Sequence, residues 1–288
     1  MKKFGIFGQG FVGNSIREGF KDYATVLTYD KYRQDLSNST PERIVTECDI
    51  IFSCVPTPMD ADTGEASTHI VEEVITAIDK LAGELDKQPT IIIKSTVPPG
   101  TTSFMNKYKT THCNVIFNPE FLTEANAVED FKNQDKIILG ADDQIDVKPV
   151  IDLFQVAFPE VPVTIVKSAE AEMMKYVINN FLSVKVSFLN EIYDICQAGG
   201  IDYNTVAQLA KMDDRTGSSH WMVPGPDGDR GFGGHCLVKD LQAMRYVASQ
   251  LEVKTPVLDG TWKTNDRVRT NRDWEGQEGR AIIHKQTV

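Results

Sequence analysis

The sequence lacks the long apolar run that a membrane-spanning helix requires. No window approaches the roughly 20 predominantly apolar residues that are needed to cross a bilayer. The apolar start of the chain is too short for a signal peptide, because it runs into glycine at Gly8. We therefore interpret residues 3–7 as a first strand and expect no membrane partner.

Cysteine and histidine are both scarce. The chain has five of each, the cysteines are scattered without a CxxC pair, and the histidines show no metal-ligand spacing. A disulfide framework and a metal site are therefore both disfavoured. Free thiols are typical of a reducing compartment, so we expect a cytoplasmic protein.

Positive charge is also in short supply. Lysine and arginine number 30 against 41 aspartates and glutamates, which gives a formal net charge of −11. Such a chain is a poor candidate for binding nucleic acid through phosphate contacts, and we expect no nucleic-acid partner. A phosphorylated small ligand is still compatible with a locally positive pocket.

Up to residue 166, short apolar runs alternate with amphipathic segments. The runs lie at residues 3–7, 25–29, 49–55, 90–94, 114–117, 136–139 and 163–166. Helical patterns lie between them at residues 12–20, 41–47, 70–85, 101–108 and 147–154. This alternation predicts an α/β fold, a Rossmann-like, doubly wound parallel sheet with helices on both faces.

After residue 167 the pattern becomes helical. Residues 168–196 contain no proline and carry apolar residues at helical spacing, which predicts one long helix. Further helical patterns follow at residues 203–210, 237–251 and about 257–272. We therefore expect a Rossmann domain over residues 1–166, a mainly helical domain over 167–270, and a polar tail over 271–288 that frays.

Residues 8–13 read GQGFVG, which matches the G-x-G-x-x-G fingerprint of dinucleotide sites. Gly8 permits the tight turn, Gly10 allows a pyrophosphate to approach the backbone, and Gly13 allows the helix to pack on the strand. The alternative is a glycine-rich turn in an unrelated α/β fold.

The residues around this fingerprint favour NAD as the cofactor. Phe11 and Val12 would open the helix whose N-terminus holds the anion. Asp30 ends the next predicted strand, where its carboxylate can accept from both ribose hydroxyls of an adenosine. The same carboxylate would repel the extra phosphate of NADP.

A second glycine-rich stretch, residues 231–240, reads GFGGHCLVKD. If the chain is helical from residue 237 on, Cys236 lies at the first turn, where free N–H groups and the helix dipole favour a thiolate. Lys239 and Asp240 follow near the same side of that helix. The pattern fits an activated nucleophile, and it fits a buried cysteine beside a glycine turn equally well.

Three further motifs leave predicted strands: VPTP at 55–58, KSTVPPGTT at 94–102 and NPEFLTE at 118–124. They stand at carboxyl ends, where open α/β sheets bind ligands, although each alone could be turn chemistry. Together with both glycine-rich stretches and KYVINNFL at 175–182, they follow the order found in one family. Over roughly residues 1–270 the chain resembles the UDP-glucose/GDP-mannose dehydrogenase family.

The resemblance implies two successive NAD-dependent oxidations of a nucleotide sugar, with UDP-glucose converted to UDP-glucuronate as the leading case. Cys236 would attack the intermediate aldehyde and carry it as a thiohemiacetal and then a thioester. Lys175 and Asn179 would stabilise the developing oxyanion from one helix face. Glu120 would act as acid or base, with Thr96 alongside.

Other roles follow from the same motifs. Asp240 would lie close to Cys236 and Lys175 and would arrange water and protons. Arg215 matches an arginine that family members extend across a dimer interface, or it is a solvated loop residue, and the family implies a homodimer. Cofactor contacts are expected at Thr57, Pro58, Thr96, Glu124 and Lys239, and substrate contacts at Phe121, Leu122, Lys175, Asn179, Arg215, Phe232 and Gly233.

The chain departs from the family pattern near its end. Family members continue into a second Rossmann-like domain that binds much of the substrate nucleotide, and nothing after residue 270 resembles one. Either the chain is a minimal enzyme, whose site is completed by the dimer partner or a separate subunit or which serves a smaller substrate, or it is a truncated form. A truncated form would keep the fold and the cofactor site but be a poor catalyst with a high KM. Two other functions stay open: a single-step β-hydroxyacid-type dehydrogenase that uses Lys175 and Asn179, and an inactive NAD-binding module.

Overall fold

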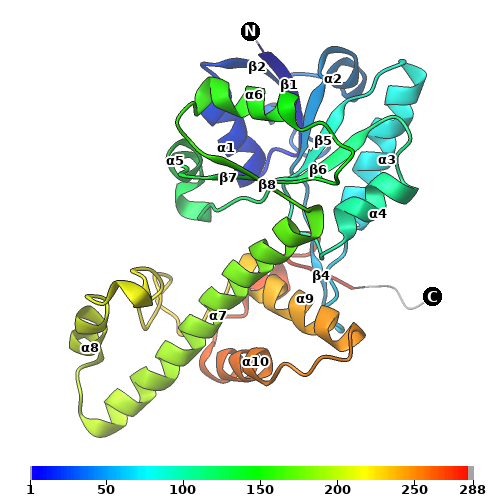
Figure 1. Cartoon of the computed structure of the whole chain (residues 1–288). Coiled ribbons are helices and arrows are strands. Elements are labelled where there is room, and N and C mark those ends of the chain that lie inside the picture. The colour runs from blue at the N-terminus through cyan, green and yellow to red at the C-terminus, as the bar shows by residue number, and fades with distance from the viewer. Residues whose placement is uncertain (1, 285–288) are drawn as a thin grey trace. The chain divides into compact units, whose positions relative to one another are not determined.

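The computed structural model describes residues 2–284, and their internal contacts divide them into two units (Figure 1). Unit 1 comprises residues 2–57 and 68–175, and unit 2 comprises residues 58–67 and 176–284. Helix α7 (Ser168–Gly199) begins in unit 1 and continues into unit 2. Within the described part of the chain, no helix is long and apolar enough to cross a membrane.

A sheet of seven strands, counted over the described residues, forms the centre of unit 1. Its order is β2-β1-β3-β5-β6-β7-β8, and neighbours are parallel except β6 and β7, which pair antiparallel through Phe117 and Gly140. The strands are β1 (Lys2–Phe7), β2 (Ala24–Tyr29), β3 (Ile50–Ser53), β5 (Thr90–Ile93), β6 (Asn114–Phe117), β7 (Ile137–Gly140) and β8 (Val163–Val166).

The order of the strands reverses at β1, which pairs with β2 on one side and with β3 on the other. Phe7 pairs with Tyr29 of β2 and with Ser53 of β3, so the carboxyl ends of the three strands are level. Gly8 and Asp30 are the next residues along β1 and β2, and they therefore emerge at one edge. Open α/β sheets bind ligands at such a reversal.

Helices cover both faces of this sheet (Figure 1). One face carries α1 (Phe11–Phe20), α5 (Ala127–Lys132) and α6 (Lys148–Ala157). The other carries α2 (Pro41–Glu47), α3 (His69–Glu84) and α4 (Thr101–Tyr108). Each layer has its own apolar core, and in the first core Phe20 packs against the rings of Phe4 and Phe154.

The predicted fold class is confirmed, because a doubly wound and mostly parallel sheet precedes a mainly helical part. The antiparallel pairing of β7 with β6 differs from the expected all-parallel sheet. The segment between β6 and β7 packs the short helix α5 against α1, where Phe131 meets Phe20 with ring centroids 6.0 Å apart. A helix of six residues is too short to show a periodic apolar pattern.

Unit 2 is mainly helical. Besides most of α7 it contains α8 (Tyr203–Ala210), α9 (Cys236–Gln250) and α10 (Pro256–Val268), and two short parallel strands, β4 (Met59–Asp60) and β9 (Ile282–Ile283). One apolar cluster joins Val186 of α7 to Leu241 of α9 and to Phe232. A second cluster joins Leu189 of α7 to Tyr203 of α8.

The segment after α10 is folded, so the prediction of a frayed tail is wrong as far as residue 283. Trp274, in the short 3-10 helix η4 (Asp273–Gly276), and Ala281 are buried in the first apolar cluster of unit 2. Ile282 and Ile283 pair with β4. Non-periodic segments give no helical or strand signal even when a few of their side chains are core residues. The rest of the predicted tail, residues 285–288, lies outside the described residues.

Candidate active site

Three glycines shape the turn between β1 and α1. Gly8 has a φ of +91°, and a Cβ there would lie 2.5 Å from the carbonyl oxygen of Cys54. A Cβ on Gly13 would lie 2.0 Å from the carbonyl oxygen of Gly8, so α1 approaches β1 only because Gly13 lacks a side chain. A Cβ on Gly10 would meet no described atom within 4 Å. The turn therefore leaves room for a pyrophosphate beside the backbone.

The start of α1 and the end of β2 complete this turn. α1 begins with Phe11 and Val12 after Gly10, and none of the described side chains caps this end. The positive end of the helix dipole is thus directed at the turn. Asp30 Oδ2 accepts a 2.7 Å hydrogen bond from the main-chain N–H of Gln9, which fixes the carboxylate beside the turn. These residues fit NAD.

Three of the predicted cofactor residues follow strands β3 and β5. Thr57 and Pro58 are buried after β3, and Thr96 is buried after β5. Ser95 Oγ donates a 2.6 Å hydrogen bond to the carbonyl oxygen of Val55, which ties the two strand ends together. The roles of Thr57, Pro58 and Thr96 toward the cofactor stay predictions.

A buried ion pair joins the loop after β6 to α7 within unit 1. Lys175 Nζ lies 2.9 Å from Glu120 Oε1, and it donates a 2.7 Å hydrogen bond to the main-chain carbonyl oxygen of Glu120. Glu120 Oε2 accepts a 2.7 Å bond from the main-chain N–H of Leu122. The carboxylate and the ammonium group that the motifs single out are therefore in direct contact.

A second buried cation, Lys94, stands at the end of β5. Its Nζ donates to Asn118 Oδ1 at 2.8 Å and to the carbonyl oxygen of Pro119 at 3.2 Å. Asn118 Nδ2 in turn donates to the carbonyl oxygen of Ile138 at 2.7 Å. Lys94 and Asn118 therefore hold the turn that carries Glu120, although the sequence interpretation, which includes both in its motifs, gives neither a role. The available signal was a lysine and an asparagine that each directly follow an apolar strand.

Burial and charge act against each other in this cluster. Burial works to raise the pKa of Glu120, but the positive charge of Lys175, the bond from Leu122 and the charge of Lys94 hold that pKa below its ordinary value. Burial lowers the pKa of Lys94 to about 8, against the attraction of nearby negative groups. Glu120 is therefore a carboxylate at neutral pH, while the pKa of Lys94 lies about one above neutral pH.

In unit 2, α9 begins at Cys236, which puts the thiol in the first helical turn, as predicted. Lys239 and Asp240 follow one turn later and are both buried. Asp240 Oδ2 accepts a 2.5 Å hydrogen bond from Asn179 Nδ2, and Asp240 Oδ1 lies 2.5 Å from Lys239 Nζ. The helix that starts with the thiol thus carries a buried cation and a carboxylate one turn away, with an amide bonded to that carboxylate.

Helix α7 contributes a residue to each charged cluster. Lys175 and Asn179 lie four residues apart and so on the same side of this helix. Lys175 pairs with Glu120 in unit 1, and Asn179 pairs with Asp240 in unit 2. The cation described beside the Asp240 carboxylate is Lys239, and the expected proximity of Asp240 to Lys175 stays a prediction.

The remaining candidates of unit 1 follow Glu120. Phe121 and Leu122 are half-buried, and Lys136 Nζ lies 5.0 Å from the centroid of the Phe121 ring. Glu124 opens the short 3-10 helix η2 (Glu124–Asn126) and is exposed. The substrate and cofactor roles predicted for these residues stay predictions.

The remaining candidates of unit 2 have distinct surroundings. Arg215, in the 3-10 helix η3 (Asp214–Thr216), is exposed and pairs with Asp213. Phe232 is buried in an apolar cluster, so its side chain has a core role, and Gly233 follows it in the loop before Cys236. Among the described residues, no group of three or more His, Cys, Asp and Glu side chains could hold a metal ion.

Comparison with known proteins decides the family. Residues 16–157 match the NAD binding domain of the UDP-glucose/GDP-mannose dehydrogenase family, and residues 169–267 match the central domain of the same family. The chain belongs to the UDP-glucose/GDP-mannose dehydrogenase family. The first match confirms the prediction that NAD is the cofactor, in agreement with the glycine turn of unit 1.

Individual members of the family are similar over most of this chain. UDP-glucose 6-dehydrogenase YwqF of Bacillus subtilis is 33% identical over 231 residues, which are 78% of this chain and 50% of the relative. GDP-mannose 6-dehydrogenase of Pseudomonas aeruginosa is 33% identical over 243 residues, 80% of this chain and 54% of the relative. The chain thus spans about half the length of the curated relatives it matches.

A solved member of the family has the same fold. The structure of a UDP-glucose dehydrogenase from the hyperthermophilic archaeon Pyrobaculum islandicum matches with a TM-score of 0.79 at 26% sequence identity. The match covers 93% of this chain and 68% of that chain. The common fold therefore includes both the Rossmann sheet and the helical part that carries Cys236.

Proposed function

We propose that the chain is a cytoplasmic, NAD-dependent nucleotide-sugar 6-dehydrogenase that oxidises UDP-glucose to UDP-glucuronate in two steps. The observation that carries the proposal is Cys236 at the first turn of α9, on the helix that also bears the buried Lys239 and Asp240. Oxidation of an alcohol to an aldehyde needs no thiol, whereas oxidation to an acid is eased by a covalent adduct. The names of the relatives, a UDP-glucose and a GDP-mannose 6-dehydrogenase, support a nucleotide sugar as the substrate.

The chemistry divides between the cofactor and three kinds of side chain. NAD, bound at the glycine turn of unit 1, supplies the hydride acceptor for both oxidations. Glu120, a carboxylate at neutral pH, takes the proton of the C6 hydroxyl directly or through a water. The Cys236 thiolate then adds to the aldehyde carbon to form a thiohemiacetal. Loss of the second hydride gives a thioester, which water hydrolyses to the acid and the free thiol.

The overall reaction converts one alcohol, two NAD⁺ and one water into one carboxylate, two NADH and three protons. Lys175 and Asn179, on one side of α7, would donate to the oxygen at C6 when it becomes negative. Asp240 holds the amide of Asn179 and so orients that donor. Thr96 would assist Glu120 from the end of β5.

Counting the NADH released per substrate tests the proposal. Wild-type protein with UDP-glucose should release two NADH per sugar and form the acid, and a panel of other nucleotide sugars should react more slowly. Cys236→Ser should form no acid, and acid formation at the wild-type rate would contradict the thioester mechanism. One NADH per substrate would indicate the single-step β-hydroxyacid type of enzyme, and NAD binding without turnover of any sugar would indicate a binding module.

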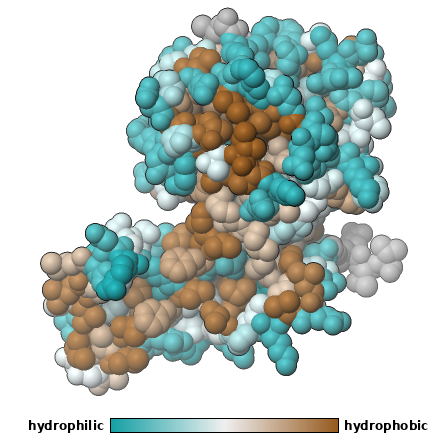
Figure 2. Space-filling view, viewed as in Figure 1, coloured by the Kyte–Doolittle hydropathy of each residue, from teal (hydrophilic) through white to brown (hydrophobic). Residues whose placement is uncertain are grey.

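An exposed apolar stripe on unit 2 supports a homodimer as the assembly. Val177, Phe181, Phe188 and Ile195 of α7 are between 57% and 66% exposed, and their spacing aligns them along one side of the helix. Figure 2 shows apolar side chains gathered over the α7 and α8 part of this unit. Large exposed apolar patches mark interaction sites, and we propose a second copy of the chain as the partner, with Arg215 directed to the neighbour's substrate.

Light scattering coupled to size exclusion tests this assembly. The wild type should elute as a dimer, and Phe181→Asp combined with Phe188→Asp should elute as a monomer with an unchanged circular dichroism spectrum. A wild-type monomer over a range of concentrations would contradict the proposed dimer.

A further inference from the structure

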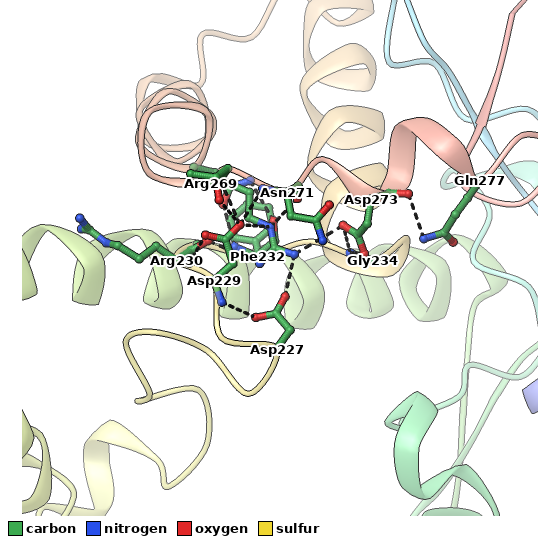
Figure 3. A network of polar contacts seen from close by, with 12 residues as sticks. Asp227, Asp229, Arg230, Phe232, Gly234, Arg269, Asn271, Asp273 and Gln277 are labelled. Atoms are coloured by element: carbon green, nitrogen blue, oxygen red, sulfur yellow. Dashed lines mark hydrogen bonds and ion pairs between the residues drawn. The ribbon is translucent and has the colours of Figure 1, made fainter.

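The glycine loop, defined as residues 231–234, leads to Cys236 and is held by side chains that recur at every fourth residue from α10 onward. Asn265 Oδ1 accepts a 2.7 Å hydrogen bond from the main-chain N–H of Phe232, and Asn265 Nδ2 donates a 3.0 Å bond to the carbonyl oxygen of Phe232. Asp273 accepts from the main-chain N–H of Gly234 with both carboxylate oxygens at 3.0 Å (Figure 3). Successive parts of the loop are therefore bonded to one segment that is distant in sequence.

Arg269 lies on the same segment, four residues after Asn265 and four before Asp273, and pairs with the carboxylates of Asp227 and Asp273 (Figure 3). Its side chain is 1% exposed, and its Nη2 lies 2.6 Å from Asp227 Oδ2 and 3.5 Å from Asp273 Oδ1. Its Nε donates a 2.8 Å bond to the carbonyl oxygen of Asn271. A buried guanidinium is tolerated only when it is paired, so Arg269 fixes the carboxylates around it.

Asp229, which precedes the glycine loop, bonds to the segment that follows α10. It accepts hydrogen bonds from the main-chain N–H groups of Thr270 and Asn271 at 3.0 and 2.7 Å, and its Oδ2 lies 3.5 Å from Arg269 Nε. Burial works to raise the pKa of Asp229, but the bonds from Asn271, Arg230 and Thr270 lower it to about 2. The carboxylate therefore stays charged over the whole range in which the enzyme would work.

The glycines of the loop are explained by these same side chains. A Cβ on Gly231 would lie 2.3 Å from Asn265 Oδ1, and φ at Gly231 is +68°. A Cβ on Gly233 would lie 2.2 Å from Arg269 Nη2 and 2.5 Å from Asp273 Oδ1. A side chain at residue 231 or 233 would displace the ends of these holding side chains, whereas glycine leaves them in place.

We propose that Arg269 and Asp273 are positioning residues for Cys236, and that they hold the glycine loop so that α9 begins at the thiol. The inference rests on the proposed function, which gives Cys236 its chemical role. The match to the family's central domain ends at residue 267, so both residues lie in the segment that follows it. The proposed role is exerted through the loop and requires no contact with substrate or cofactor.

The bond to Gly234 is the step that links the network to the thiol. Gly234 lies two residues before Cys236, and its φ of +68° is a conformation that only glycine adopts readily. Without Asp273 the N–H of Gly234 loses its partner, and the loop gains other conformations of similar energy. The start of α9 then frays, and the thiol spends less time beside the N–H groups that favour the thiolate.

The rate of Cys236 alkylation by iodoacetamide, measured against pH on the full chain, tests the proposal. Burial raises the pKa of Cys48 and Cys54 to about 12 and also raises the pKa of Cys113, so these thiols react slowly. Peptide mass spectrometry isolates the signal of Cys236. We expect Asp273→Ala to slow alkylation near neutral pH about tenfold, with the midpoint of the pH profile moved up by about one.

Two further variants separate positioning from general stability. Asp273→Asn keeps an oxygen that can accept from Gly234, so it should recover most of the wild-type rate. Asp266→Ala removes an exposed pair with Arg272 on the same segment and should leave the profile unchanged. Unfolding temperatures are measured for every variant, because a merely structural role would lower the unfolding temperature of Asp273→Ala and leave the midpoint of its pH profile in place.

The possible outcomes have different meanings. An activated wild-type thiol whose pH profile is the same in Asp273→Ala overturns the positioning role and leaves the proposed function standing. A wild-type Cys236 with the slow alkylation and ordinary midpoint of an unactivated thiol overturns the proposed function, and the positioning role falls with it. A raised midpoint in Asp273→Ala that Asp273→Asn corrects supports both.

Discussion

Glu172 gives a sharp test of how burial and hydrogen bonding compete in unit 1. It lies in the second turn of α7, is fully buried, and accepts bonds from the start of α4. Its Oε2 accepts from the main-chain N–H of Gly100 at 2.5 Å, and its Oε1 accepts from the N–H and the hydroxyl of Thr102 at 2.8 and 2.6 Å. All three donors are neutral groups, so their bonds offset only part of the cost of burying the negative charge.

Burial raises the pKa of Glu172 from 4.5 to about 7, although the bonds from Thr102 and Gly100 favour the charged form. At a pH between these two pKa values, Glu172 is therefore protonated in the folded protein and ionised in the unfolded chain. The stabilising contribution is complete below the unfolded pKa and is lost as pH rises through the folded pKa. Integrated from about pH 5 to about pH 8, the loss is ~2.5 kcal/mol in the free energy of unfolding.

Glu172→Gln removes this titration while it keeps the shape of the side chain. Its free energy of unfolding, measured by urea titration followed by circular dichroism, should improve relative to wild type by ~2.5 kcal/mol between the same two pH values. Glu170→Gln, on the same helix but exposed, is the matched control and should show no such change. A difference between wild type and Glu172→Gln that stays constant within about 0.5 kcal/mol across this range refutes the reasoning.

Three other substitutions test the cofactor turn, the core and the buried charges. Gly13→Val should abolish NAD binding in calorimetric titration, because its Cβ would lie 2.0 Å from the carbonyl oxygen of Gly8; unchanged affinity would argue against the turn as the cofactor site. Phe20→Ala should lower the free energy of unfolding by about 3–5 kcal/mol, since its ring packs against other phenylalanines, and a loss near zero in urea titration would contradict that packing. Asp240→Ala should cost about 3 kcal/mol in the same assay, because buried Lys239 loses its carboxylate, and wild-type stability would show that this pair contributes nothing.

Local signals in the sequence predict an element well when neighbouring residues set its ends. Helix α2 occupies residues 41–47 as predicted, because Pro41 suits the first helical position and the side chain of Thr40 accepts from the main-chain N–H of Arg43. Strand β6 also has its predicted bounds, since an apolar run is followed at once by the polar Asn118. The alternation of such elements was sufficient to predict the class of fold.

Pairings between distant segments could not be predicted in this way. β4 and β9 have two residues each, which is too few for any period, and their partnership brings residues 59–60 beside 282–283. The aspartates and arginine that hold the glycine loop are likewise spread over residues 227–273. Each of them, considered alone, is a charged residue in a polar stretch, and only the fold reveals that Arg269 is buried among carboxylates.

The partners of the charged site residues show why motifs predict composition better than contact. Glu120 and Lys175 come from different motifs, and the fold brings them into a contact that neither motif specifies. The resemblance predicts that Asp240 lies near Lys175, which stays a prediction, and the cation described beside Asp240 is Lys239, the residue directly before it. A buried carboxylate needs a cation at contact distance to offset its desolvation, and an adjacent lysine can meet that need without depending on any other element. Motifs can thus predict which charged residues belong to a site. Which of them pair depends on the fold, because it decides which cation lies at contact distance from each buried carboxylate.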